Sequence, residues 1–327
     1  MKHVSTIILA LLIAVSQGSI YAQVSAASEK PFSFDFSGRE TKSPGNNLPD
    51  TRQEIKPEII QPSVPKSDVD VNIPVSKSKK DKTFAVIIAN ENYKNESQVL
   101  FARNDGEIFK KYCLQTLGLP EKNLRYIADA TLNEIRKEMN WLGSVAEAFE
   151  GEANIIFYYA GHGIPDEKSQ SAYLLPVDGY GSDVESGYKI DDLYAKLGSL
   201  HAKGVFVFLD ACFSGAQRSG AMLASARGVA IKAKDAAPVG NMVVFSAAQG
   251  DETAYPYSEQ GHGLFTYFLL KKLQETKGEV TLGELGNYIT RNVRQQSVLV
   301  NNKSQTPTVT PSAAMGDSWQ KITLSEP

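Results

Sequence analysis

The sequence predicts an α/β fold in which a mostly parallel sheet is covered by helices on both faces. Short apolar runs alternate with longer segments whose apolar residues recur at helical spacing. The apolar runs are continuous rather than alternating with polar residues, which is typical of strands buried on both faces. The chain has 327 residues, 42% of them hydrophobic and 22% charged, so a sizeable core is possible.

Each expected element follows from its local pattern. Buried strands need short apolar runs, and amphipathic helices need a period of about 3.6 residues. We expect strands over residues 84–89, 123–128, 153–160, 205–210 and 242–247, with the second of these at an edge of the sheet. We expect helices over residues 104–117, 131–149, 191–200, 263–274 and 281–296. Ligands in such a sheet bind beyond the carboxyl ends of the strands.

The amino-terminal region divides into two segments. Residues 1–22 combine Lys2, an apolar stretch from Thr6 to Val15 and small residues around Ala22, which is the layout of a secretory signal peptide. We therefore expect a secreted or periplasmic protein, without a transmembrane segment after the signal is removed. Residues 23–82 are rich in Pro, Ser, Lys and Asp, which predicts a disordered linker or propeptide.

The remaining chain is expected to form one domain over residues 83–312, followed by a tail over residues 313–327. Residues 217–241, within the domain, are rich in Ala, Gly, Lys and Ser and predict a mobile loop. The net charge of −3 gives no basic footprint for nucleic acid, which we exclude as a partner. The oligomeric state is left open.

Two short motifs carry the chemistry. His162 lies in Tyr-Ala-Gly-His-Gly after the third expected strand, and Cys212 lies in Asp-Ala-Cys-Phe-Ser-Gly after the fourth. An imidazole and a thiol would meet at the carboxyl edge of one sheet. A thiolate is a strong nucleophile at neutral pH, and a His within hydrogen-bond reach can generate it. The pair predicts a cysteine hydrolase.

These motifs resemble those of the caspase-like cysteine peptidases, in which the His precedes the Cys by roughly 50 residues. Asp-Ala-Cys-Phe-Ser-Gly is more similar to the signature of metacaspases and their bacterial relatives, the orthocaspases, than to that of animal caspases. The resemblance covers residues 83–296. It implies a caspase-like three-layer sandwich and a cysteine endopeptidase that forms a thioester with its substrate. Cys212 would attack the carbonyl, His162 would transfer the proton, and the backbone N–H groups of Gly163 and Cys212 would form the oxyanion hole.

The resemblance also implies a substrate pocket. Asp105, at the start of the first helix, and Asp210, two positions before the Cys, correspond to acidic residues that line the P1 pocket of metacaspase-like enzymes. Two carboxylates would select Arg or Lys at P1, so the expected partner is a protein or peptide with a basic P1 residue. The alternative is that Asp105 caps a helix and Asp210 caps a turn.

A calcium site is a further implication of the resemblance. Asp178, Asp191 and Asp192 resemble part of the calcium cluster of some metacaspases, although no cofactor is required by the expected mechanism. Ca²⁺ takes six to eight oxygen ligands, and turn or helix-cap roles explain the same three carboxylates.

Other readings of the motifs remain open. Cys212 and His162 could be ordinary core residues of an inactive peptide-binding module, or the thioester could pass to an amine in a transpeptidase-like acyl transferase. Cys113, Tyr158 and Tyr159 are expected in the core. His201 and His262 match no catalytic position, and we expect them at the surface or as helix caps.

Overall fold

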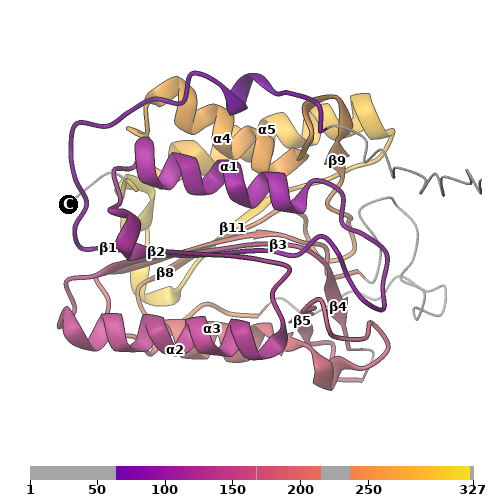
Figure 1. Cartoon of the computed structure of the whole chain (residues 1–327), viewed down its shortest axis with the longest axis horizontal. Helices are drawn as coiled ribbons and strands as arrows, with labels where there is room; N and C mark the ends of the chain where they lie inside the picture. Colours follow the sequence, from indigo (N-terminus) through magenta and orange to yellow (C-terminus); the bar gives the residue numbers. More distant parts are fainter. Residues whose placement is uncertain (1–63, 167, 215–235, 325–327) are drawn as a thin grey trace, which may run out of the picture. The chain divides into compact units, whose positions relative to one another are not determined.

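A six-stranded sheet runs through the computed structural model of the chain, which describes residues 64–166, 168–214 and 236–324 (Figure 1). The strand order is β11-β8-β7-β3-β1-β2. Five strands are parallel, and the edge strand β11 runs antiparallel to β8. The strands are β1 (Thr83–Ala89), β2 (Leu124–Ala128), β3 (Asn154–Ala160), β7 (Gly204–Asp210), β8 (Met242–Ser246) and β11 (Thr308–Pro311).

Helices cover both faces of this sheet (Figure 1). One face carries α1 (Ala102–Gln115), α4 (Leu264–Thr276) and α5 (Leu282–Asn301). The other carries α2 (Leu132–Ala148) and α3 (Ile190–Gly198). The predicted three-layer α/β class, all five predicted strands and all five predicted helices are confirmed, with boundaries shifted by a few residues.

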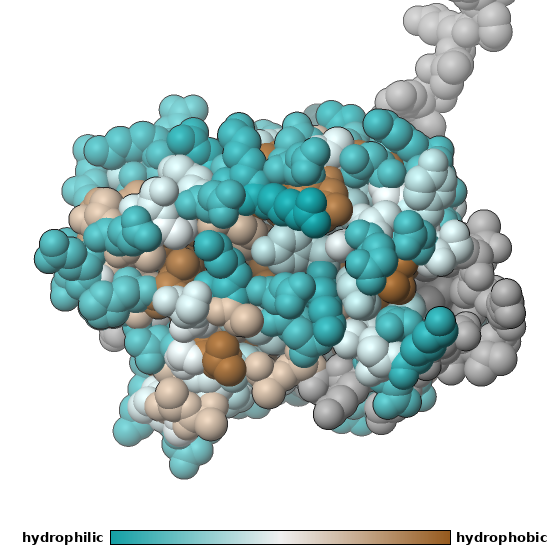
Figure 2. Space-filling view, turned by 90° about the horizontal axis from the view of Figure 1, so that it is seen from below, coloured by the Kyte–Doolittle hydropathy of each residue, from teal (hydrophilic) through white to brown (hydrophobic). Residues whose placement is uncertain are grey.

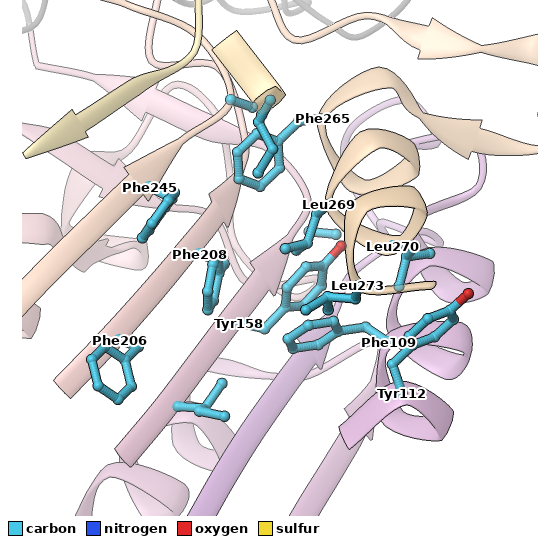
Figure 3. Packing of buried hydrophobic residues seen from close by; sticks show 14 of the residues in the cluster. Phe109, Tyr112, Tyr158, Phe206, Phe208, Phe245, Phe265, Leu269, Leu270 and Leu273 are labelled. Atoms are coloured by element: carbon cyan, nitrogen blue, oxygen red, sulfur yellow. The ribbon is translucent and has the colours of Figure 1, made fainter. Parts of the chain in front are cut away.

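The core lies in two layers, one on each side of the sheet. Successive β1 residues alternate between them: Ile87 belongs to the layer under α1 and α4, whereas Val86 and Ile88 belong to the layer over α2 and α3. Figure 3 shows the first layer, where aromatic side chains from the strands meet residues of α1 and α4. Tyr158, which has no exposed surface, stacks on Phe109 with ring centroids 4.7 Å apart.

Side-chain caps explain where two helices begin. Thr131 accepts a hydrogen bond from the backbone N–H of Glu134, whose carboxylate accepts from the Thr131 N–H in return. Thr281 and Glu284 make the same reciprocal pair at α5. Each of these reciprocal pairs, called a capping box, provides acceptors for backbone N–H groups that the first turn of a helix leaves unpaired.

Several short elements gave no sequence signal. A three-stranded sheet follows β3 and consists of β4 (Gly163–Pro165), β5 (Ala172–Leu174) and β6 (Tyr188–Lys189). A hairpin of β9 (Pro256–Tyr257) and β10 (His262–Gly263) precedes α4. Short 3-10 turns lie at η1 (Asp68–Asp70), η2 (Glu121–Asn123), η3 (Val184–Ser186), η4 (Ser258–Gln260), η5 (Ala313–Met315) and η6 (Ser318–Lys321).

The end of the predicted linker is packed, which corrects the prediction of a disordered segment for residues 64–82. Val69 has no exposed surface and belongs to the core layer under α1 and α4. The Tyr112 hydroxyl donates to the Val69 carbonyl at 2.9 Å, and Lys271 pairs with Asp68 at 2.7 Å. The packing of this segment was not predicted, because its sequence has no periodic apolar residues. It packs through one buried side chain, Val69, and through polar bonds.

The predicted tail is also packed over residues 313–324. Met315 and Leu324 are buried, and the Leu282 N–H at the start of α5 donates to the Ile322 carbonyl at 2.7 Å. The domain therefore extends beyond the predicted boundary at residue 312. The predicted signal peptide, residues 23–63 of the predicted linker and residues 217–235 of the predicted mobile loop lie outside the described residues.

The face covered by α2 and α3 is mainly hydrophilic, with hydrophobic residues scattered singly across it (Figure 2). Such scatter is normal for the surface of a folded domain. Across the described part of the chain, none of the helices has the length and apolar character needed to cross a membrane.

Candidate active site

The sheet brings His162 and Cys212 to the same edge. Strands β3 and β7 are parallel neighbours, and their last residues, Ala160 and Asp210, pair in register. His162 and Cys212 each lie two residues beyond that pair, and backbones of adjacent strands are about 4.8 Å apart. Both residues are buried, with His162 1% and Cys212 4% exposed. The structure therefore places His162 and Cys212 on neighbouring segments at the carboxyl edge of the sheet.

A backbone carbonyl fixes the His162 ring. Nε2 lies 2.8 Å from the carbonyl oxygen of Ser97, in the loop that joins β1 to α1. A carbonyl oxygen only accepts, so Nε2 carries the hydrogen, and Nδ1 holds the lone pair of the neutral ring. This tautomer leaves Nδ1 as the atom that can take a proton.

Two tyrosines hold the backbone of His162. The Tyr93 hydroxyl accepts from the His162 N–H at 2.7 Å, and its ring lies 4.7 Å from the imidazole between centroids. The Tyr159 hydroxyl donates toward the His162 carbonyl at 2.8 Å. Burial raises the pKa of both phenols well above the usual range, so they stay neutral and can donate.

The core placement of Tyr158 and Tyr159 is confirmed, but the contacts of Ser97, Tyr93 and Tyr159 with His162 were not predicted. A signal was present. The polar run from Asn90 to Tyr93 directly follows β1, and such a run at the carboxyl end of a central strand lies at the edge where ligands bind.

Gly163 allows two backbones to approach closely. A Cβ at this position would lie 2.6 Å from the Cys212 carbonyl oxygen and against the ring of Phe213. Any larger residue would push the segment after β3 away from the segment after β7. The resemblance implies that the N–H groups of Gly163 and Cys212 form an oxyanion hole. In the structure, the backbones of these two residues lie close together.

Asp105 and Asp210 meet at the start of α4, and both are buried. Both Asp105 carboxylate oxygens lie 3.1 Å from the Gly263 N–H. Asp210 Oδ2 accepts from the Thr266 hydroxyl at 2.6 Å and from its N–H at 3.3 Å. The two predicted pocket carboxylates thus converge from α1 and β7 on one helix amino terminus, where negative charge is stabilised. The cap role left open for Asp105 exists, but at α4 rather than at its own helix.

The prediction of a surface or cap position for His262 is wrong. His262 has no exposed surface and lies in β10, one residue before the α4 cap Gly263. Its Nδ1 lies 2.8 Å from Asp105 Oδ1, and its Nε2 lies 2.9 Å from Asp70 Oδ1. His201, in contrast, is exposed as predicted.

The three predicted calcium ligands lie beside or within the first turns of helices. Asp178 is exposed and accepts from the Leu132 N–H at 3.1 Å, and Asp191 and Asp192 lie in the first turn of α3. Within residues 64–166, 168–214 and 236–324, no group of three or more His, Cys, Asp or Glu side chains could hold a metal ion. These residues therefore do not make a calcium site by themselves, and calcium stays a prediction.

Cys113 and Cys212 are both buried and form no disulfide. Cys113 is fully buried in the core, as predicted, and burial raises the pKa of its thiol far above the usual range. Of the two, only Cys212 lies beside an imidazole-bearing segment at the sheet edge.

Known proteins resemble this chain in the pattern of a family and in fold. A family model described as "Caspase domain" matches residues 82–315 of the chain. A solved structure of protein GSU0716 from Geobacter sulfurreducens is 18% identical, with a TM-score of 0.51, and the match covers 75% of this chain and 98% of that one. Caspase-1 from Spodoptera frugiperda is 16% identical, with a TM-score of 0.49 and coverage of 76% and 94%. No curated protein matches.

Proposed function

This chain belongs to the caspase domain family of cysteine peptidases, and we propose that it is an endopeptidase that cuts after Arg or Lys. Cys212 is the nucleophile and His162 the general base and acid. The observation that carries the proposal is the position of both residues, two beyond the paired ends of β3 and β7, with His162 Nε2 bound to the Ser97 carbonyl.

In the first step, His162 Nδ1 takes the proton of the Cys212 thiol, and Sγ attacks the carbonyl carbon of the scissile peptide bond. The carbonyl oxygen becomes an oxyanion that accepts hydrogen bonds from the N–H groups of Gly163 and Cys212. The tetrahedral intermediate collapses as the C–N bond breaks. The amine leaves with the proton from His162, and an acyl thioester remains on Cys212.

In the second step, water attacks the thioester carbonyl while His162 Nδ1 takes its proton. The C–S bond breaks, the carboxylic acid leaves, and the thiolate recovers the proton from His162. The Ser97 carbonyl stabilises the imidazolium present between these transfers, because an N–H bond to an acceptor favours the charged ring. The Tyr93 and Tyr159 hydroxyls fix the backbone from which the ring projects.

The choice of Arg or Lys at P1 rests on Asp105 and Asp210. Their carboxylates converge at the start of α4 from two different elements. Buried carboxylates favour a cationic partner with donors that can reach them. The proposed partner is therefore a protein or peptide with a basic P1 residue. The signal-like segment over residues 1–22 supports export of the protein to a secreted or periplasmic location.

A mixed peptide library, incubated with the wild type and with Cys212→Ala, tests the proposal. We expect the wild type to cut after Arg or Lys and Cys212→Ala to cut nothing. Cys113→Ala is the matched control, because it removes the buried thiol and should leave cleavage intact. Arms with added Ca²⁺ and with a chelator test the calcium prediction. Cleavage that persists in Cys212→Ala, or that follows acidic residues, would overturn the proposal.

A further inference from the structure

A buried chain of charged groups joins the amino-terminal segment to the proposed P1 pocket. The imidazole of His262, in β10, lies between two carboxylates, that of Asp70 in η1 and that of Asp105 in α1. The distances are 2.9 Å from Nε2 to Asp70 and 2.8 Å from Nδ1 to Asp105. The side chains of His262 and Asp105 have no exposed surface, and that of Asp70 is 16% exposed.

The imidazole in this chain is cationic. A carboxylate accepts hydrogen bonds, so each ring nitrogen must carry a hydrogen to bond both acids. Burial lowers the pKa of His262, but the bonds and charges of Asp105 and Asp70 outweigh burial and raise the pKa to about 9. The Asn104 amide, also near the ring, donates to the Gly261 carbonyl at 2.9 Å. Tyr257 pairs with His262 across the β9–β10 hairpin.

The same bonds fix the orientation of Asp105. Its Oδ1 accepts from His262 Nδ1 and lies 3.1 Å from the Gly263 N–H, which is also 3.1 Å from Oδ2. One oxygen of this carboxylate accepts from the His262 cation, and both oxygens lie near the Gly263 N–H. The carboxylate cannot rotate without breaking these charge-assisted bonds.

The segment that carries Asp70 is itself anchored beside the pocket. The Ser67 hydroxyl donates to the Gln260 side chain at 2.9 Å, Asp68 pairs with Lys271, and Val69 is buried. The Ser67 side chain and Asp70 also form a reciprocal capping box around η1. Asp70 therefore reaches His262 from a fixed backbone.

We propose that His262 is a positioning residue of the P1 pocket, which sets the Asp105 carboxylate for a basic P1 side chain, and that Asp70 in turn orients His262. This inference rests on the proposed function, because it assigns a task to the pocket of that same site. It gives Asp70, which precedes the first strand in the sequence, a role in the peptidase domain, since this residue supplies the second acid bonded to His262.

The test compares Asp70→Asn with Asp68→Asn in the full chain, using a peptide with Arg at P1. Asp70→Asn should raise KM about tenfold and change kcat by less than about twofold, because it weakens a charge-assisted bond that serves ground-state and transition-state binding alike. Asp68→Asn, two residues away on the same turn, weakens the bonds that Asp68 accepts from Lys271, Tyr267 and Ser67, and it should leave both constants within about twofold.

Two substitutions of His262 separate its two bonds. His262→Asn places an amide nitrogen near the position of Nδ1, so it keeps a donor for Asp105. His262→Gln places one near Nε2, so it keeps a donor for Asp70 and loses the one for Asp105. We expect KM for the Arg peptide to rise more in His262→Gln than in His262→Asn. Thermal unfolding and the alkylation rate of Cys212 by iodoacetamide show in each variant whether the fold and the nucleophile are intact.

The outcomes are distinguishable. If the wild type cuts no Arg or Lys peptide, the proposed function fails and this inference falls with it. If the wild type cuts but Asp70→Asn behaves like Asp68→Asn, only the inference fails. The same holds if the two His262 variants raise KM equally, or if kcat falls while KM is unchanged.

Discussion

Single atoms from two segments, the loop between β1 and α1 and the strand β3, hold His162 in place. The Ser97 carbonyl fixes the tautomer, and the hydroxyls of Tyr93 and Tyr159 fix the backbone on either side of the ring. The positions of His162 and Cys212 were predictable from sequence, because each follows an apolar strand and parallel strands end at one edge. Their supporting atoms were not predictable, since a backbone carbonyl carries no residue type and a buried Tyr looks like core.

Tyr93→Phe tests the support of His162. The change removes the acceptor of the His162 N–H and leaves a buried donor without that bond, which costs about 1–3 kcal/mol. We expect kcat to fall about tenfold, with KM for the peptide little changed, because Tyr93 contacts the base rather than the substrate.

Steady-state kinetics measure this effect, with Tyr126→Phe as the control. The Tyr93 hydroxyl donates to the Leu175 carbonyl, and the Tyr126 hydroxyl likewise donates to a backbone carbonyl, that of Arg103, but at the edge strand β2. Equal losses in the two variants would mean that Tyr93 acts only through general stability.

Gly163→Ala tests the close approach of the two motif backbones. The added methyl would meet the Cys212 carbonyl at 2.6 Å, so the backbone must shift and the oxyanion donors move. Loss of one such donor typically costs about 100- to 1,000-fold in rate, and we expect kcat to fall by that order.

The control for this change is Gly143→Ala. Gly143 lies inside α2, and a Cβ there would have only the Lys196 ammonium near it, at 3.9 Å. It should retain activity and gain up to about 1 kcal/mol of stability from higher helix propensity. Full activity in Gly163→Ala would rule out a tight oxyanion site at this position.

At the scale of elements, sequence patterns predicted the long pieces and missed the short ones. Strands and helices of five or more residues have a readable period or apolar run, whereas β4, β6, β9 and β10 are two or three residues long. The edge strand β11 has a mixed sequence, Thr-Val-Thr-Pro, and only its partner β8 defines it. The docking of η1 escaped prediction because Asp70 and His262 lie 192 residues apart.

The bonds of His262 to Asp105 and Asp70 make the stability of the fold depend on pH. The pKa of His262 is about 9 in the folded protein and about 6.5 in an unfolded chain. Since the folded value is the higher one, the stabilisation is fully present below pH 6.5 and is lost as pH rises from 6.5 through 9. This stabilisation of the folded state amounts to about 3 kcal/mol.

Urea unfolding at pH 6 and at pH 9.5 measures this dependence. In His262→Asn, most of the difference in the free energy of unfolding between the two pH values should disappear, because the Asn side chain does not titrate. A variant that keeps the full wild-type pH dependence would show that another group is responsible.

At the scale of the whole molecule, the three-layer architecture makes one edge of the sheet the place where distant segments meet. The loop after β1, the turn after β3, the end of β7 and the start of α4 all reach this edge. Chain order and apolar runs were enough to predict the layers. The extent of the domain was not predictable, because residues 64–82 and 313–324 pack through isolated side chains rather than through periodic faces.

The central claim is that Cys212 and His162 act together on a substrate with a basic P1 residue. An arginyl chloromethyl ketone tests it directly, since a thiolate displaces chloride and leaves a stable thioether that mass spectrometry can locate. We expect a single adduct on Cys212, which forms faster than with an aspartyl reagent and about 100-fold or more slowly in His162→Ala. An adduct on Cys113, an equal rate in His162→Ala, or a faster reaction with the aspartyl reagent would contradict it.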